Sequence, residues 1–99
     1  MSSISSIALS GMHAARTALE VSAGNVANAN TPGYKRRETV NTSQSGGGVD
    51  AQVRVADQEG ASLEVDLVAQ LQAKNAFLAN LAVFKTGSKL AGTLLDKKA

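Results

Sequence analysis

The chain's single proline, Pro32, fixes where its first long helical pattern has to end. A proline disfavours the α conformation in the residue before it, so a helix that approaches from the N-terminal side must stop by about residue 30. Gly33 follows and adopts a positive φ at no steric cost. Residues 31–34 are therefore predicted to form a tight turn of type II. Three asparagines precede the turn, and their amides can bond the freed carbonyls of the last helical turn or their own backbone: Asn25, Asn28 and Asn30.

Two amphipathic patterns flank this corner. Residues 3–29 carry an apolar stripe at heptad-like spacing, which is thin because two members are alanine and one is serine: Ile4, Ala8, Met12, Ala15, Leu19, Ser22 and Val26. Residues 64–95 carry a stronger stripe on one side of a helical wheel: Leu67, Leu71, Phe77, Leu78, Leu81, Phe84 and Leu95. The sequence thus predicts a mainly α fold, with two long helices as an antiparallel hairpin or coiled coil.

The connection between the helices has two parts. Residues 38–48 are polar and glycine-rich, which is typical of a flexible linker. Residues 49–55 alternate between apolar and polar side chains, which predicts a short strand. Extension that resumes at 61–65 would make this strand part of a small hairpin. The predicted organisation is one domain over residues 1–99, with an N-terminal helix at 1–30, the connection at 31–63 and a C-terminal helix at 64–99.

Composition limits how well such a chain can bury itself. Only 3% of its 99 residues are aromatic, and much of the 43% hydrophobic content is alanine. The core is therefore expected to be thin, which favours extra burial against partners or other copies. A net charge of +2 is too small to indicate nucleic acid or an anionic membrane, and no apolar run approaches the ~20 residues of a membrane span.

Residues for enzymatic chemistry are sparse. The single histidine, His13, has no visible nucleophile partner, and the absence of cysteine excludes disulfides and thiolate metal sites. The carboxylates Glu59, Glu64 and Asp66 are interpreted as solvated charge at a helix start. We therefore expect neither an enzyme nor a bound cofactor or metal. Residues 34–37 combine a tyrosine with three basic residues, so a small nucleic-acid contact is the remaining binding alternative.

The corner also resembles a known signature. Asn25-Val26-Ala27-Asn28 and Thr31-Pro32-Gly33-Tyr34-Lys35-Arg36 are similar, position by position, to the segment that ends the N-terminal helix of the axial proteins of the bacterial flagellum. This family includes the rod, hook and hook-associated proteins. The pattern is specific, because helix propensity alone does not produce this order of asparagines, turn and basic end.

The second helix resembles the C-terminal signature of the same family. The similar segments are Val65-Asp66-Leu67-Val68, Ala73 to Asn80, Lys85-Thr86 and Leu90 to Leu95, with Phe77 where the family usually has tyrosine. The resemblance thus covers about residues 1–40 and 63–97. The middle is shorter than is usual in the family, so the chain is most similar to a shortened proximal-rod protein.

The resemblance implies a structural, non-enzymatic component of the flagellar basal-body rod or hook base that assembles through its terminal helices. Its partners would be other rod or hook subunits, itself and the flagellar export apparatus, without membrane insertion. The N-terminal residues lack a basic region and a solid apolar stretch, so we expect export without a cleaved signal peptide. The alternative is a free-standing helical hairpin that binds another partner helix. The predicted subunit-interface residues are Asn25, Asn28, Thr31, Pro32, Gly33, Tyr34, Lys35, Arg36, Leu67, Leu71, Phe77, Leu78, Leu81 and Phe84.

Overall fold

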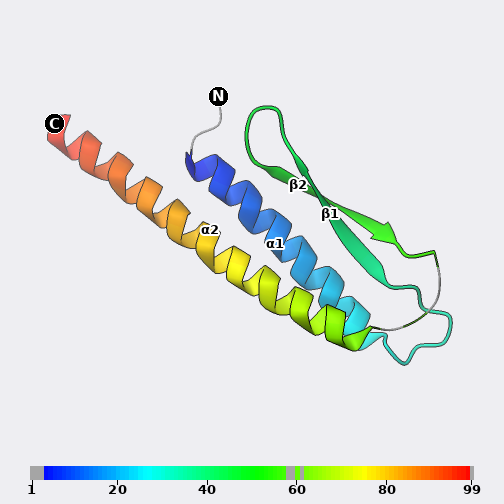
Figure 1. Ribbon diagram of the computed structural model, residues 1–99. Coiled ribbons are helices and arrows are strands. Elements are labelled where there is room, and N and C mark those ends of the chain that lie inside the picture. The colour runs from blue at the N-terminus through cyan, green and yellow to red at the C-terminus, as the bar shows by residue number, and fades with distance from the viewer. Residues whose placement is uncertain (1–3, 58–59, 61, 99) are drawn as a thin grey trace.

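Two helices and one β-hairpin make up the fold (Figure 1). The computed structural model describes residues 4–57, 60 and 62–98. The elements in chain order are α1 (Ile4–Ala27), β1 (Arg37–Ser43), β2 (Val49–Val55) and α2 (Leu63–Lys98). The predicted fold class is confirmed, because the two helices pack against each other and a two-stranded hairpin occupies the connection.

The helices run antiparallel. Along α1 the contacts with α2 pass from Ser5 beside Gly87 to Gly11 beside Asn80, and then to the Asn25–Asp66 hydrogen bond. With 24 residues against 36, α1 is about 36 Å long and α2 about 54 Å. The C-terminal part of α2 therefore extends beyond the start of α1 (Figure 1). Neither helix combines the length and the apolar character that a membrane span needs within the residues described.

The linker prediction for residues 38–48 was wrong, because most of that segment is β1. The antiparallel register runs from Arg37 opposite Val55 to Ser43 opposite Val49. β1 is rich in β-branched side chains, which suit a strand even where the segment is polar. Glycines provide the reversal, since Gly47 and Gly48 have φ values of 94° and 95°.

The second option for a hairpin, strand extension at 61–65, was also wrong. Leu63 already begins α2, and residue 61 lies outside the described residues. β2 pairs backwards along the chain with β1 and not forwards. The alternation of residues 49–55 thus correctly predicted the strand, while its partner was hidden in a polar sequence.

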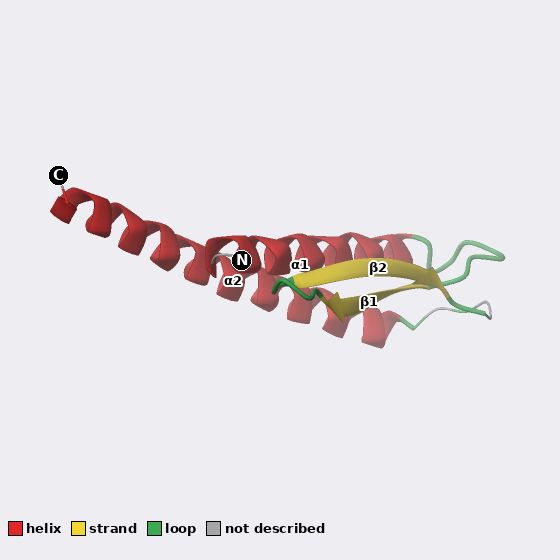
Figure 2. Cartoon of the chain, turned by 90° about the horizontal axis from the view of Figure 1, so that it is seen from above, coloured by secondary structure: helices red, strands yellow, loops and turns green. Residues whose placement is uncertain are grey.

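The hairpin packs against α1, which lies between it and α2 in the view of Figure 1. Figure 2 shows the same arrangement from above, with both strands following the helix pair lengthwise. A serine joins the hairpin to α1, because the Ser10 hydroxyl accepts a hydrogen bond from the Val49 N–H (3.0 Å) and donates one to the Ile7 carbonyl (2.7 Å). A single α1 residue thus anchors the start of β2.

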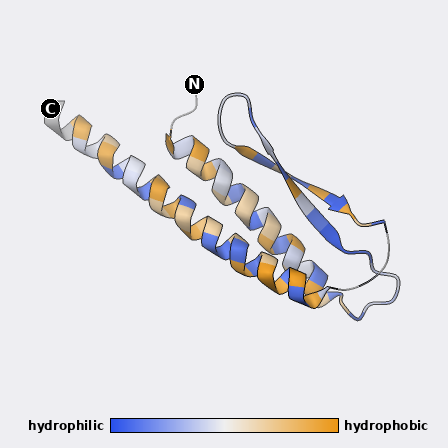
Figure 3. Cartoon of the chain, in the orientation of Figure 1, coloured by the Kyte–Doolittle hydropathy of each residue, from blue (hydrophilic) through white to orange (hydrophobic). Residues whose placement is uncertain are grey.

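Small side chains form the core. The buried apolar residues are Ala8, Met12, Ala14, Ala15 and Ala73. No large side chain in the described part of the chain is fully buried, which agrees with a molecule only 14 Å across its shortest axis. The thin core expected from composition is therefore confirmed. Many apolar residues remain on the outside, and Figure 3 shows them along the whole of α2.

The turn at the end of α1 was correctly predicted. The Tyr34 N–H donates to the Thr31 carbonyl (3.2 Å), and Gly33 has the positive φ of 78° that a type II turn requires. The Asn28 amide also has its predicted role, because it donates to the Gly24 carbonyl (2.9 Å). The Asn25 side chain, however, does not bond a carbonyl of the last helical turn. It bonds Tyr34, Arg37 and Asp66 instead.

Candidate functional site: the corner lock and the open helix face

Asn25 is the centre of a polar cluster that joins three distant segments of the chain. Its side-chain oxygen accepts hydrogen bonds from the Arg37 N–H (2.9 Å) and the Tyr34 hydroxyl (3.0 Å). Its amide nitrogen donates to the Arg37 carbonyl (2.8 Å) and to Asp66 (3.1 Å). These four bonds use the full capacity of a primary amide. Asn25 is only 3% exposed, so the cluster satisfies a buried polar group completely.

Asp66 brings the start of α2 into the same cluster. Arg36 binds it with two hydrogen bonds, from Nη2 to Oδ1 (2.6 Å) and from Nε to Oδ2 (3.2 Å). Oδ1 also accepts the bond from Asn25. The sequence-based interpretation of Asp66 as a solvated charge was wrong, because this residue is 3% exposed. We name this cluster the corner lock, and its members are Asn25, Tyr34, Arg36, Arg37 and Asp66.

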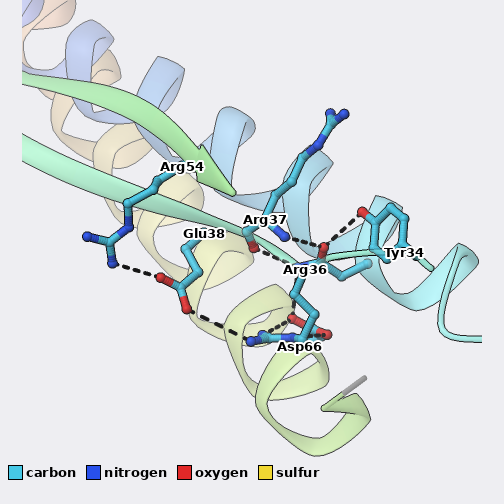
Figure 4. A network of polar contacts seen from close by, with 7 residues as sticks. Tyr34, Arg36, Arg37, Glu38, Arg54 and Asp66 are labelled. Carbon is cyan, nitrogen blue, oxygen red and sulfur yellow. Dashed lines mark hydrogen bonds and ion pairs between the residues drawn. The ribbon is translucent and has the colours of Figure 1, made fainter. Parts of the chain in front are cut away.

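The turn explains how these residues come together. Pro32 and Gly33 reverse the chain, so the segment after them returns along the end of α1. Successive residues in an extended segment point to opposite sides. The Arg36 guanidinium consequently faces Asp66, whereas the Arg37 guanidinium extends away from the cluster and only its backbone takes part (Figure 4).

A second carboxylate connects the lock to the hairpin. Glu38 lies 4.0 Å from Arg36 and accepts a hydrogen bond from the Arg54 guanidinium on β2 (2.8 Å). The hydrogen bond from Arg54 lowers the pKa of Glu38. Both partners of this outer pair are substantially exposed, so we expect it to contribute far less stability than the buried pair.

Two opposing effects set the pKa of Asp66. Burial acts to raise it, but the hydrogen bonds from Arg36 and Asn25 and the positive charge of Arg36 together hold the pKa below its usual value. The hydrogen bond to Asp66 in turn raises the pKa of Arg36. The lock is therefore an ion pair at neutral pH, and Asp66 is a poor candidate for proton transfer.

This pKa shift predicts an acid-sensitive contribution to folding. A carboxylate whose pKa is depressed in the folded state stabilises it fully above the unfolded pKa of about 3.9, and the contribution is lost as the pH falls through the folded value. We expect the wild-type melting temperature to fall below about pH 4. The Asp66→Asn variant should lack this part of the acid dependence. Circular dichroism melts between pH 7 and pH 2 measure the melting temperatures of the wild type and the variant. If the two melting temperatures fell equally with pH, the stabilising role of the Asp66 carboxylate would be contradicted.

The remaining corner residues stay on the surface. Thr31, Pro32, Gly33 and Lys35 are exposed. Residues 28–34 and Gly60 line a hollow of about 460 Å³ at this end of the molecule. Lys35 contributes its backbone to a short parallel bridge with Gly60. The lock thus occupies the inner side of the corner, and the turn itself remains open to a neighbour.

The predicted apolar stripe of α2 is divided by the structure. Leu81 and Phe84 are half-buried, and Phe77 is at the border of exposure. Leu67, Leu71 and Leu78 are about half exposed or more and have no cover within the described chain. Small residues face α1 in their place, among them Ala73 and Gly87. We name the uncovered set the leucine face: Leu19 of α1 with Leu67, Leu71 and Leu78 of α2.

A shallow hollow of about 340 Å³ lies on this face. Its lining comes from both helices: Leu19, Leu67, Gln70, Leu71 and Lys74. None of these residues belongs to the hairpin, which packs on another side of α1. The hollow combines apolar side chains with one lysine, a composition that suits contact with another amphipathic helix. It has no cluster of His, Asp or Glu that could hold a metal among the residues described.

Comparison with known families gives this geometry a context. Residues 6–35 match the family described as "Flagella basal body rod protein". Over this segment, which is less than half of its length, the chain is similar to the flagellar rod proteins. The matched segment runs through most of α1 and the turn, up to the residue before Arg36. A search of the curated proteins found no match.

Similarity to this family supports a structural role of the flagellar basal-body type, together with an association with other basal-body components. The match ends before α2, so the similarity of the C-terminal helix to the axial proteins stays a prediction. The sequence pattern did not predict the corner lock. Two signals for it were present: an asparagine two residues before the helix end and an aspartate in the first turn of α2.

Proposed function

We propose that this chain is a structural subunit of the flagellar rod or hook base, and that it assembles through its two helices. One observation carries the proposal: the segment similar to rod proteins lies on a helix pair that leaves many large apolar side chains exposed. Exposed apolar area of this kind is typical of an interface and is costly in a monomer. The proposal assigns the chain no catalytic step and no cofactor.

The corner lock supports this role mechanically. It attaches the end of α1, the turn and the start of α2 to one another through bonds that are 2.6–3.2 Å long. A subunit held this way presents the leucine face and the outer side of the turn in a fixed relation. We infer that Asn28, Lys35 and the turn residues contact a neighbouring subunit, while Tyr34 and Arg36 act by holding the turn in position.

Basal bodies provide the direct test. A strain that lacks the chain should lose motility, and a tagged copy should be recovered in purified basal bodies. A tagged Leu71→Asp variant should express at the wild-type level but fail to incorporate, because a charge would enter the apolar contact. Glu20→Lys is the control on an exposed part of α1. Normal swimming of the deletion strain, together with basal bodies free of the tagged chain, would remove the structural role.

We also propose that the chain reaches the basal body through the flagellar export apparatus without cleavage of a signal peptide. The resemblance to axial proteins supports this route. Mass spectrometry of the chain extracted from basal bodies should recover a peptide that contains residues 2–16. A mature N-terminus beginning further along α1 would contradict the proposal.

The second candidate is a free-standing helical hairpin that binds a partner helix without building the axis, and the short connection favours it. The described connection contains only a turn and two strands of seven residues each. Recovery of the chain in a soluble complex with one protein, and never in basal bodies, would favour this candidate.

A further inference from the structure

One line of side chains on α2 carries a charge pattern that the helix pair does not use. Glu64, Leu71, Leu78 and Lys85 follow one another at intervals of seven residues, which is two helical turns, so they lie almost in line. All four are exposed, with Leu71 at 59% and Leu78 at 50%. From the N-terminal end of α2, the line reads negative, apolar, apolar, positive.

We propose that this line binds the same line of a second copy in the antiparallel direction, which makes a two-fold symmetric dimer. When one α2 is reversed against another, Glu64 comes level with the partner's Lys85, and Leu71 comes level with the partner's Leu78. Each dimer would then have two ion pairs that flank two apolar contacts. A parallel pair in register would oppose like charges and is disfavoured.

The surface around the line suits a helix as the occupant. The line spans about 32 Å, or roughly three heptads. Leu71 of the line also lines the hollow described above, together with Leu19 and Leu67. The hairpin packs elsewhere on α1, so a second helix meets no strand there. Because a single helix pair buries an area at the low end of stable interfaces, we infer a weak and reversible dimer.

The symmetry makes Lys74 an informative position. The two-fold axis would pass between Lys74 and Asn75, so Lys74 would lie close to the partner's Lys74. The lysine stems can pack while the ammonium groups turn to solvent, but the like charges oppose association. Removal of this charge should therefore strengthen the dimer, although most polar substitutions at an interface weaken it.

A two-fold contact closes on itself and cannot extend into a rod. The dimer therefore differs in symmetry from the assembly contact proposed above and would compete with it for Leu71, but it does not depend on that proposal. In the free chain it would cover the leucine face that α1 and the hairpin leave open.

Sedimentation equilibrium of the full chain, at low and moderate salt, tests the pairing. Glu64→Lys and Lys85→Glu should each weaken the dimer about tenfold, because each disturbs two symmetric contacts. The double variant should return to within about threefold of wild type, and Lys74→Gln should bind more tightly. Asp50→Lys is the matched control, since it makes the same charge change on exposed β2 and should have no effect.

The absence of cysteine permits a second measurement of direction. An Asn75→Cys variant should oxidise readily to a covalent dimer, because position 75 lies next to the axis. A Glu64→Cys variant should not, since the two copies of position 64 lie at opposite ends. A monomer up to millimolar concentration, a double variant without recovery, or efficient self-crosslinking at position 64 would each overturn the proposal.

Discussion

Replacement of Asp66 by alanine should lower the free energy of unfolding by about 3 kcal/mol, which is the low end for one half of a buried ion pair. The loss is large because Arg36 keeps its charge with a side chain only 18% exposed, and because Asn25 loses an acceptor. Urea unfolding followed by circular dichroism measures it. For a chain of this size, such a loss is a large part of the total stability.

Two variants make this result specific. Asp66→Asn keeps the shape of the side chain and should cost less, so it serves as the folded variant if alanine abolishes folding. Arg54→Ala breaks the exposed hydrogen bond to Glu38 at a comparable distance of 2.8 Å and should leave the unfolding midpoint unchanged. An Arg36→Ala, Asp66→Ala double variant should be less unstable than the sum of the two. If the two losses in unfolding free energy were additive, Arg36 and Asp66 would have no measurable interaction energy.

The helices and the turn could be predicted because their determinants are local. Pro32 and Gly33 specify the end of α1 by backbone sterics alone, and α1 ends at Ala27 where the prediction gave 29. Periodicity placed the start of α2 within one residue of Leu63. β1 was missed because its side chains are polar. It is a strand because β2 and α1 supply its pairing and packing, which a local pattern does not contain.

The corner lock could not be predicted for a different reason. Asn25 and Asp66 are separated by 41 residues, and each has an adequate local explanation, as a helix cap and as a favourable charge in a first turn. Only the return of the chain after Gly33 brings Arg36 between them. Sequence reasoning named Asn25, Tyr34 and Arg36 as important, yet it assigned their contacts to a neighbouring subunit. Contacts to a neighbour stay a prediction for the exposed corner residues.

Introduction of leucine at Ala73 should be the second most damaging change, with a cost of up to about 3 kcal/mol. Ala73 is 6% exposed and lies in the strip of small residues between the two helices, where it lines a hollow of about 340 Å³. The approach is close at Gly11, where an added Cβ atom would lie 2.5 Å from the Asn80 side-chain oxygen. We expect a leucine at this buried position to exceed the space beside it and to push α2 away from α1. Thermal melts report the cost.

Ala79→Leu is the matched control, because it adds the same atoms to an exposed position of the same helix and should change stability by less than about 0.5 kcal/mol. Equal melting temperatures for the two variants would mean that the helices do not depend on close approach. If Ala73→Leu alone is damaging, small residues specify which side of α2 meets α1. Leu67, Leu71 and Leu78 then stay exposed because small residues occupy the side of α2 that meets α1, and the open leucine face follows from the way the helix pair packs.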